Sequence, residues 1–121
     1  MNFIDYELRN KRYSNSNYDL QRLVGKKFLG ISYKISDKSK WKDTQAAYDV
    51  LLEWEDYIMK FTSPGKRQIP IYLYKLVNRR LENWYMMPNH ACEMVMLYFE
   101  GIEEEINFNT YGGIEWEEIK E

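Results

Sequence analysis

The chain has 121 residues, of which 45% are apolar and 30% are charged, and its formal net charge is −2 at pH 7. This length fits a single domain over residues 1–121, and the apolar fraction and mixed charge signs exclude an intrinsically disordered chain. The single cysteine excludes an internal disulfide framework, and no window approaches eighteen uncharged apolar residues that would span a membrane. The first residues carry charges throughout and contain no apolar core of signal-peptide length. We therefore expect a cytoplasmic protein that makes no membrane contact.

The first third of the chain is predicted to contain two short helices and a strand. Residues 3–12 fit a short amphipathic helix. In the stretch 20–36 two periods compete, because its apolar residues fit one helical stripe and, in the second half, also alternate with polar residues. A glycine inside a helix costs about 1 kcal/mol relative to alanine, so Gly25 favours a break. We predict a short helix that ends at Val24, followed by a strand over about 27–36.

The clearest periodic pattern begins near Ser39 and stops before the cluster Ser63-Pro64-Gly65. Apolar side chains recur there at offsets of four and three, and charged side chains occupy the opposite side. This spacing predicts one long amphipathic helix, which Trp54 would anchor centrally if the helix lies on a sheet. The apolar stripe consists of Ala47, Leu51, Trp54, Ile58 and Phe61.

The next two elements each have two interpretations. Pro70 suits the first turn of a helix that ends at Pro88, but the β-branched and aromatic residues of 69–74 are also typical of an edge strand. The stretch 92–99 likewise fits either a helix, with Asn89 as its cap, or a fully buried strand. The apolar stripe of the helix after Pro70 would consist of Tyr74, Val77, Leu81 and Trp84.

The final part of the chain is predicted to be a β-hairpin. Apolar residues alternate with asparagines and then with glutamates on either side of a turn signal at 109–113. The residues predicted to face the core are Ile106, Phe108, Ile114 and Trp116, with the glutamates between them facing water. Together these elements predict an α+β fold, with several helices packed on one side of a small antiparallel sheet. A mostly α-helical bundle is the alternative.

Residue types and spacings argue against assembled catalytic chemistry. His90 and Cys92 occur once each, and two residues apart on a helix they point to nearly opposite sides. Closed zinc sites draw three or four ligands from Cys and His, and the chain has two such residues in all. The glycines form neither a GxxxxGK[ST] nor a GxGxxG arrangement, and no GxSxG elbow is present. We therefore predict no enzyme activity, no metal and no cofactor.

Charge is distributed unevenly along the chain. Residues 1–96 hold 16 Lys and Arg against 11 Asp and Glu, which is +5, whereas residues 97–121 hold one Lys and eight Glu, which is −7. Aromatic side chains serve as anchors at the centre of protein interfaces, and carboxylates at the rim raise association rates through steering. An acidic, aromatic C-terminal face therefore suits a partner protein that has a basic surface.

From this polarity we predict a small protein-binding inhibitor. Small immunity proteins, antitoxins and phage-encoded inhibitors act in this way, by masking the basic surface of a nuclease or another nucleic-acid-binding protein. Trp116 cannot both fill the core and anchor a partner, and the alternation favours the core. The residues predicted to contact the partner are Glu103, Glu104, Glu105, Tyr111, Glu115, Trp116, Glu117 and Glu118.

Two other functions stay open. The first is nucleic-acid or nucleotide binding, in which cationic side chains follow a phosphate backbone while aromatic rings stack on bases. The second is a structural scaffold, with a homodimer formed through exposed aromatic residues. The residues predicted for nucleic-acid binding are Lys75, Arg79, Arg80, Trp41 and Tyr72.

Overall fold

A computed structural model gives the fold and describes residues 19–36, 47–89 and 92–119. Six antiparallel strands form one sheet in the order β1-β2-β3-β6-β5-β4. Three short 3₁₀ helices accompany them within these ranges. The strands are β1 Phe28–Ile35, β2 Tyr48–Trp54, β3 Tyr57–Ser63, β4 Leu81–Asn89, β5 Cys92–Phe99 and β6 Ile106–Glu118, and the helices are η2 Leu20–Leu23, η3 Lys66–Gln68 and η4 Ile71–Leu76.

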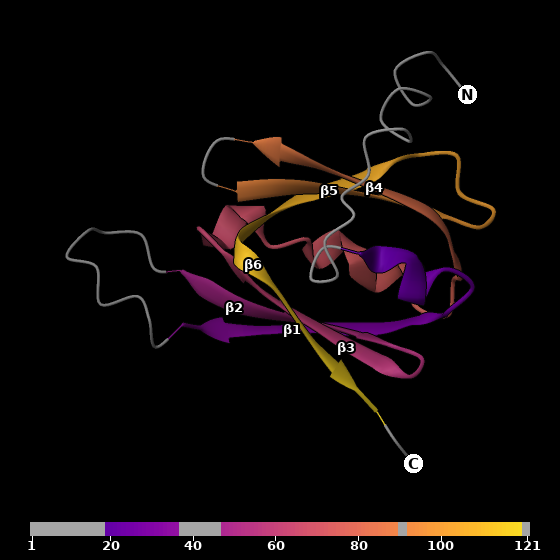
Figure 1. The fold of residues 1–121 in the computed structure, drawn as a ribbon, viewed down its shortest axis with the longest axis horizontal. Coiled ribbons are helices and arrows are strands. Elements are labelled where there is room, and N and C mark those ends of the chain that lie inside the picture. Colours follow the sequence, from indigo (N-terminus) through magenta and orange to yellow (C-terminus); the bar gives the residue numbers. More distant parts are fainter. Residues whose placement is uncertain (1–18, 37–46, 90–91, 120–121) are drawn as a thin grey trace.

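The sheet bends into two layers that share one long strand. Figure 1 shows β1, β2 and β3 in one layer, β4 and β5 in the other, and β6 running from one layer to the other. The first half of β6, Ile106 to Tyr111, pairs with β5, and the second half, Ile114 to Glu118, pairs with β3. β6 is therefore the strand that joins the two layers through a continuous ladder.

The chain just before β1 also meets the start of β4, so the two edges of the sheet come together at one end. Lys27, just before β1, forms an antiparallel bridge with Arg80, just before β4, and Val24 forms a parallel bridge with Leu81. The bridges include backbone hydrogen bonds from Gly25 to Leu81 (2.8 Å) and from Leu81 to Lys26 (3.1 Å). The described strands thus form a six-stranded antiparallel barrel that is closed along this short seam.

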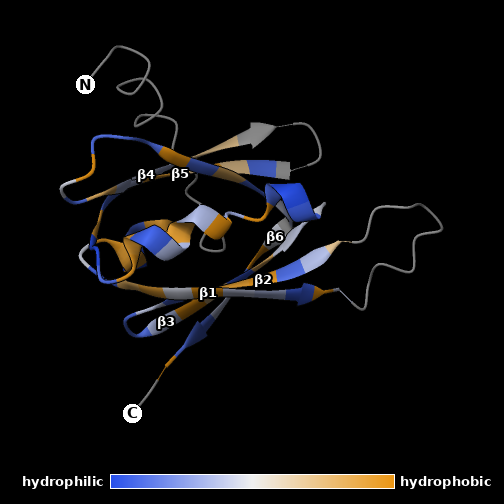
Figure 2. Ribbon diagram, turned by 180° about the vertical axis from the view of Figure 1, so that it is seen from behind, coloured by the Kyte–Doolittle hydropathy of each residue, from blue (hydrophilic) through white to orange (hydrophobic). Residues whose placement is uncertain are grey.

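The core lies between the two layers, and η2 and η4 help to fill it. Figure 2 shows hydrophobic residues on these helical segments. Trp54 is fully buried and stacks on Phe99 of the opposite layer, with ring centroids 5.9 Å apart, while Phe28 meets it edge-on at 5.1 Å. Leu20 and Leu23 of η2 and Leu73 of η4 are also fully buried.

The predicted α+β fold, with several helices on one side of a sheet, is wrong, and so is the alternative of a mostly α-helical bundle. The described chain is mostly antiparallel sheet, because the stretch assigned to the longest helix forms the β2–β3 hairpin instead. Its two-residue turn is Glu55-Asp56, and Asp56 has a positive φ of 68°. The 4-3-4-3 spacing was misleading, because Leu51 and Ile58 of the supposed stripe face outward, whereas Val50 and Leu52 are buried.

The predicted C-terminal hairpin is also wrong. Residues 106–118 form one strand, and the register shifts where Phe61 pairs with Ile114 and Thr62 with Tyr111. This bulge contains Gly113, whose φ of 96° lies in the left-handed region that glycine tolerates best. The chain therefore changes sheet layer at the glycine pair and does not turn back.

The predicted inward face of this segment is confirmed. Phe108 and Ile114 are buried, and Ile106 and Trp116 are partly buried against the core. The predicted alternation holds on both sides of the bulge. At the bulge β6 has two more residues than β3, and an even number of extra residues leaves the same positions facing the core.

The early elements also follow the sequence prediction. The short helix is η2, the break falls at Gly25, where φ is 83°, and the strand predicted over about 27–36 is β1. The open choice at 92–99 is resolved as the strand β5.

Around Pro70 the structure has a helix, as one of the two interpretations predicted, but this helix is short, and the alternative of an edge strand is wrong. The stretch 69–74 largely belongs to the short 3₁₀ helix η4, which ends at Leu76. Most of the residues predicted to continue this helix to Pro88 form β4 instead, which pairs with β5 along its length. The predicted helix at 3–12, Trp41 and His90 lie outside the described residues.

Candidate functional site

The outward face of the β1–β2–β3–β6 layer carries three transverse rows of side chains. Residues paired across adjacent strands point to the same side of a sheet, and successive residues alternate between sides. Because Val50, Leu52 and Trp54 of β2 face the core, Asp49, Leu51 and Glu53 face outward. The rows across the four strands are Gly30-Glu53-Ile58-Glu117, Ser32-Leu51-Lys60-Glu115 and Lys34-Asp49-Thr62-Tyr111.

We call these rows the acidic face. They hold four carboxylates against two lysines, and the half-buried side chains of Leu51 and Ile58 lie between the charges. Tyr111 is 37% exposed at the β6 end of the third row. The end of β6 beyond it is hydrophilic in Figure 2. The face therefore combines a small apolar centre, one aromatic ring and excess negative charge.

Lys60 partly neutralises the β6 side of this face. Its Nζ lies 2.9 Å from Glu117 Oε2, and both side chains are about half exposed. The hydrogen bond to Glu117 raises the pKa of Lys60 above its usual range, and the charges of Glu117 and Glu115 add to this effect. Of the two glutamates, Glu115 is the one that forms no ion pair with a described residue.

The structure brings together only part of the predicted partner site. Tyr111, Glu115 and Glu117 share the acidic face. Glu103 and Glu104 are exposed in the β5–β6 loop, at the opposite end of β6. Ten residues of extended strand span about 33 Å, so these loop carboxylates and the strand carboxylates form two separate groups.

The remaining three predicted residues lie outside the acidic face. Glu105, next to the loop, accepts hydrogen bonds from Tyr98 Oη (2.6 Å) and Asn107 Nδ2 (3.4 Å). Trp116 packs against the core, and the Arg22 guanidinium lies 4.4 Å from the centroid of its ring. Glu118 follows on the same side of β6 as Trp116, away from the acidic face.

Sequence reasoning missed Asp49 and Glu53 as members of this face. The predicted long helix placed both on its solvent side. A helix at this position gave no reason to expect either residue beside β6. The alternation of Asp49, Leu51 and Glu53 was the available signal for an outward strand face. Their position beside β6 depends on pairing through β3, which no local pattern encodes.

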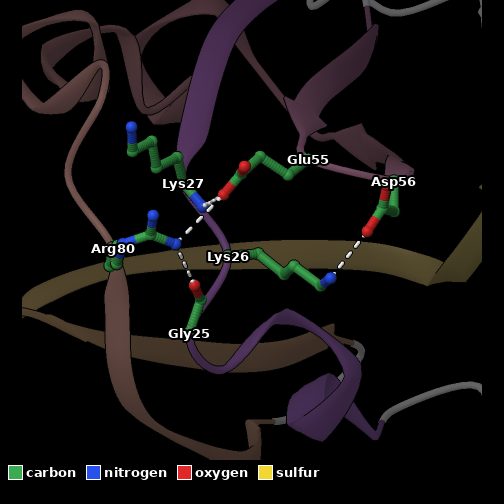
Figure 3. A network of polar contacts seen from close by, with 6 residues as sticks. All are labelled: Gly25, Lys26, Lys27, Glu55, Asp56 and Arg80. Atoms are coloured by element: carbon green, nitrogen blue, oxygen red, sulfur yellow. Dashed lines mark hydrogen bonds and ion pairs between the residues drawn. The ribbon is translucent and has the colours of Figure 1, made fainter.

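Arg80, one of the residues predicted for nucleic-acid binding, lies in the seam between β1 and β4 (Figure 3). Arg80 Nη1 donates to Gly25 O (2.6 Å) and to Glu55 Oε1 (3.3 Å), and Glu55 Oε1 also accepts from the Lys27 backbone N–H (2.7 Å). Lys26 pairs with Asp56 at 2.6 Å. This network ties the β2–β3 turn to the starts of β1 and β4, so Arg80 has a structural role.

Arg80→Ala is expected to lower the free energy of unfolding by about 1 kcal/mol, because it removes a charge-assisted hydrogen bond at a partly exposed site. Arg79→Ala is the matched control, since Arg79 is exposed and stands outside the network, and a change below about 0.5 kcal/mol is expected. Urea denaturation of both variants measures the difference. Equal losses would contradict the structural role of Arg80.

Within the described ranges, no group of three or more His, Cys, Asp and Glu side chains is arranged to hold a metal ion. The same ranges contain no helix of the length and apolarity needed to cross a membrane. In comparisons with protein families, curated proteins and solved structures, nothing matches this chain.

Proposed function

We propose that this protein is a small, cytoplasmic, protein-binding inhibitor, and that its acidic face docks onto a basic surface of the partner. The partner class is a nuclease or another nucleic-acid-binding protein, whose substrate surface the acidic face would cover. The observation that carries the proposal is the set of three transverse rows, which place four carboxylates and Tyr111 on one side of one sheet layer.

Three features support this role. Tyr111 and the aliphatic pair Leu51 and Ile58 provide apolar contact area, as anchors at the centre of an interface do. The surrounding carboxylates provide long-range attraction to a basic surface and raise the association rate. Lys60 holds Glu117 in place at 2.9 Å, which reduces the side-chain freedom that binding would have to remove.

The test is a double charge reversal, Glu115→Lys with Glu117→Lys. The tagged wild-type protein is used to retain proteins from the native extract, and each retained protein is purified and tested against both the wild type and the variant. The affinity for such a partner is expected to fall about 100-fold or more, because close charge pairs at interfaces contribute several kcal/mol. Calorimetry measures the affinity, and a nucleic-acid cleavage or binding assay measures inhibition of the partner.

The matched control is Glu103→Lys with Glu104→Lys, the same change of charge in the β5–β6 loop at the far end of β6. This control variant is expected to retain partner binding and inhibition. Circular dichroism of both variants checks the fold. Equal loss in both variants, or an affinity that survives the Glu115/Glu117 reversal and 0.5 M salt, would contradict docking through the acidic face.

A further inference from the structure

A second surface, on the other side of β1, gathers most of the exposed apolar side chains. Nine large hydrophobic residues of the described ranges are exposed, and seven of them lie on β1 or between Ile71 and Val77, in and just after η4. η4 packs against β1, so the two groups lie on elements that contact each other. The seven are Leu29, Tyr33, Ile35, Ile71, Tyr72, Tyr74 and Val77, and we call the part formed by Tyr33, Tyr72 and Tyr74 the tyrosine surface.

The geometry of η4 explains why its tyrosines face outward. In a 3₁₀ helix residues three apart lie above one another. Leu73 and Leu76 form the row that is buried in the core, so the rows Ile71-Tyr74 and Tyr72-Lys75 face away from it. The Tyr72 hydroxyl donates to the Asn107 backbone carbonyl of β6, which fixes η4 while the ring stays 42% exposed.

Positive charge is concentrated in the segment that contains η3 and η4. The stretch 57–81 contains six Lys and Arg and no Asp or Glu. Lys60 and Arg80 pair with Glu117 and Glu55, and the other four are exposed and form no ion pair with a described residue. These four are Lys66 and Arg67 of η3, Lys75 of η4, and Arg79.

Exposed lysine and tyrosine side chains side by side suit a nucleic acid as ligand, because lysine attracts phosphates and bases can stack on tyrosine rings. Lysine is depleted in protein–protein interfaces, so the lysine content of this surface differs from that of a typical protein–protein interface. Reading a duplex groove requires an α-helix or a β-ribbon that enters it, and η4 has six residues. Single-stranded binding, in contrast, combines a cationic track with aromatic rings.

We infer that the tyrosine surface binds single-stranded nucleic acid. Lys66, Arg67, Lys75 and Arg79 contact phosphates, and Tyr33 and Tyr74 stack on bases. Tyr74 is the most exposed ring of the three at 59%, and Lys75 Nζ lies 5.9 Å from its centroid. Arg80 belongs to the seam and takes no part.

The experiment is fluorescence anisotropy of labelled twelve-nucleotide oligothymidine and oligouridine with the full chain. Binding is expected to weaken with salt, with a log–log slope of about −3 for four phosphate contacts. Tyr74→Ala is expected to reduce affinity roughly 5- to 100-fold, whereas Tyr74→Phe retains it. Lys66→Ala with Arg67→Ala is expected to bring the slope to about −1.5.

Lys34→Ala is the matched control, because Lys34 lies on β1 but belongs to the acidic face. It is expected to change oligonucleotide binding little, and the Glu115/Glu117 reversal is expected not to weaken it. Absence of binding to both oligonucleotides in low salt would overturn the inference. So would a greater loss with Lys34→Ala than with Lys66→Ala/Arg67→Ala, or light scattering that shows a dimer abolished by Tyr74→Ala. None of these results would affect the proposed role of the acidic face.

Discussion

Trp54→Ala is expected to lower the free energy of unfolding by about 3–5 kcal/mol, the range typical of a buried tryptophan. Trp54 is fully buried and contacts Phe28 of β1 and Phe99 of β5, so its ring connects both layers of the sheet. Small domains are stable by only about 5–15 kcal/mol, so this loss is a large share of the total. Urea denaturation monitored by circular dichroism measures it.

Trp54→Phe separates the contribution of the ring from that of its N–H group. Phenylalanine keeps an aromatic ring against Phe99 and removes Trp54 Nε1, a buried donor that has no hydrogen-bond partner in the described chain. An unsatisfied buried donor costs about 1–3 kcal/mol, so its removal offsets part of the lost packing. Trp54→Phe is expected to lose less than half as much stability as Trp54→Ala. Equal losses would show that stacking between the layers is not the source of the effect.

Gly113→Val is expected to lower the free energy of unfolding by about 1–3 kcal/mol, because valine at a φ of 96° is strained. Gly113 lies in the bulge where β6 changes from pairing with β5 to pairing with β3. Strain at this position acts on the one strand that both layers share. Thermal and urea unfolding of the variant measure the loss.

Gly30→Val provides the same chemical change on β1. The φ of Gly30 lies outside the left-handed region, and no heavy atom lies within 4 Å of where its Cβ would be. Valine also suits a strand better than glycine, so stability is expected to stay within about 0.5 kcal/mol or to rise. A comparable loss at both glycines would contradict the special role of the bulge.

The prediction from sequence was correct where apolar residues clearly alternated with polar ones. The alternation after Gly25 predicted β1, and the alternation around the glycine pair identified the four inward residues of β6. It failed at 47–61, because half-buried outward residues such as Leu51 and Ile58 completed a helix-like spacing with Trp54 and Phe61. Tertiary pairing overrides such local signals.

The acidic face shows the same limit. Tyr111, Glu115 and Glu117 were identified from local composition and alternation. Asp49 and Glu53 could not be added, because their approach to β6 requires β3 to pair with a strand more than forty residues later. Nor could the sequence separate Arg80 from Arg79, since only the seam distinguishes them.

The shared strand has a consequence for synthesis on the ribosome. β6 follows all the other described strands in the sequence. Tyr57 of β3 pairs with Glu118 of β6, so this pair cannot form until Glu118 has been synthesised. Until the translated chain includes β6, the three-stranded meander and the β4–β5 hairpin have no ladder between them except the short contact at Lys27 and Arg80. Contacts between residues so distant in sequence form slowly. The two layers therefore gain their shared strand only after β6 has been synthesised, and until then the interior-facing side chains of both halves lack the cover of the other layer.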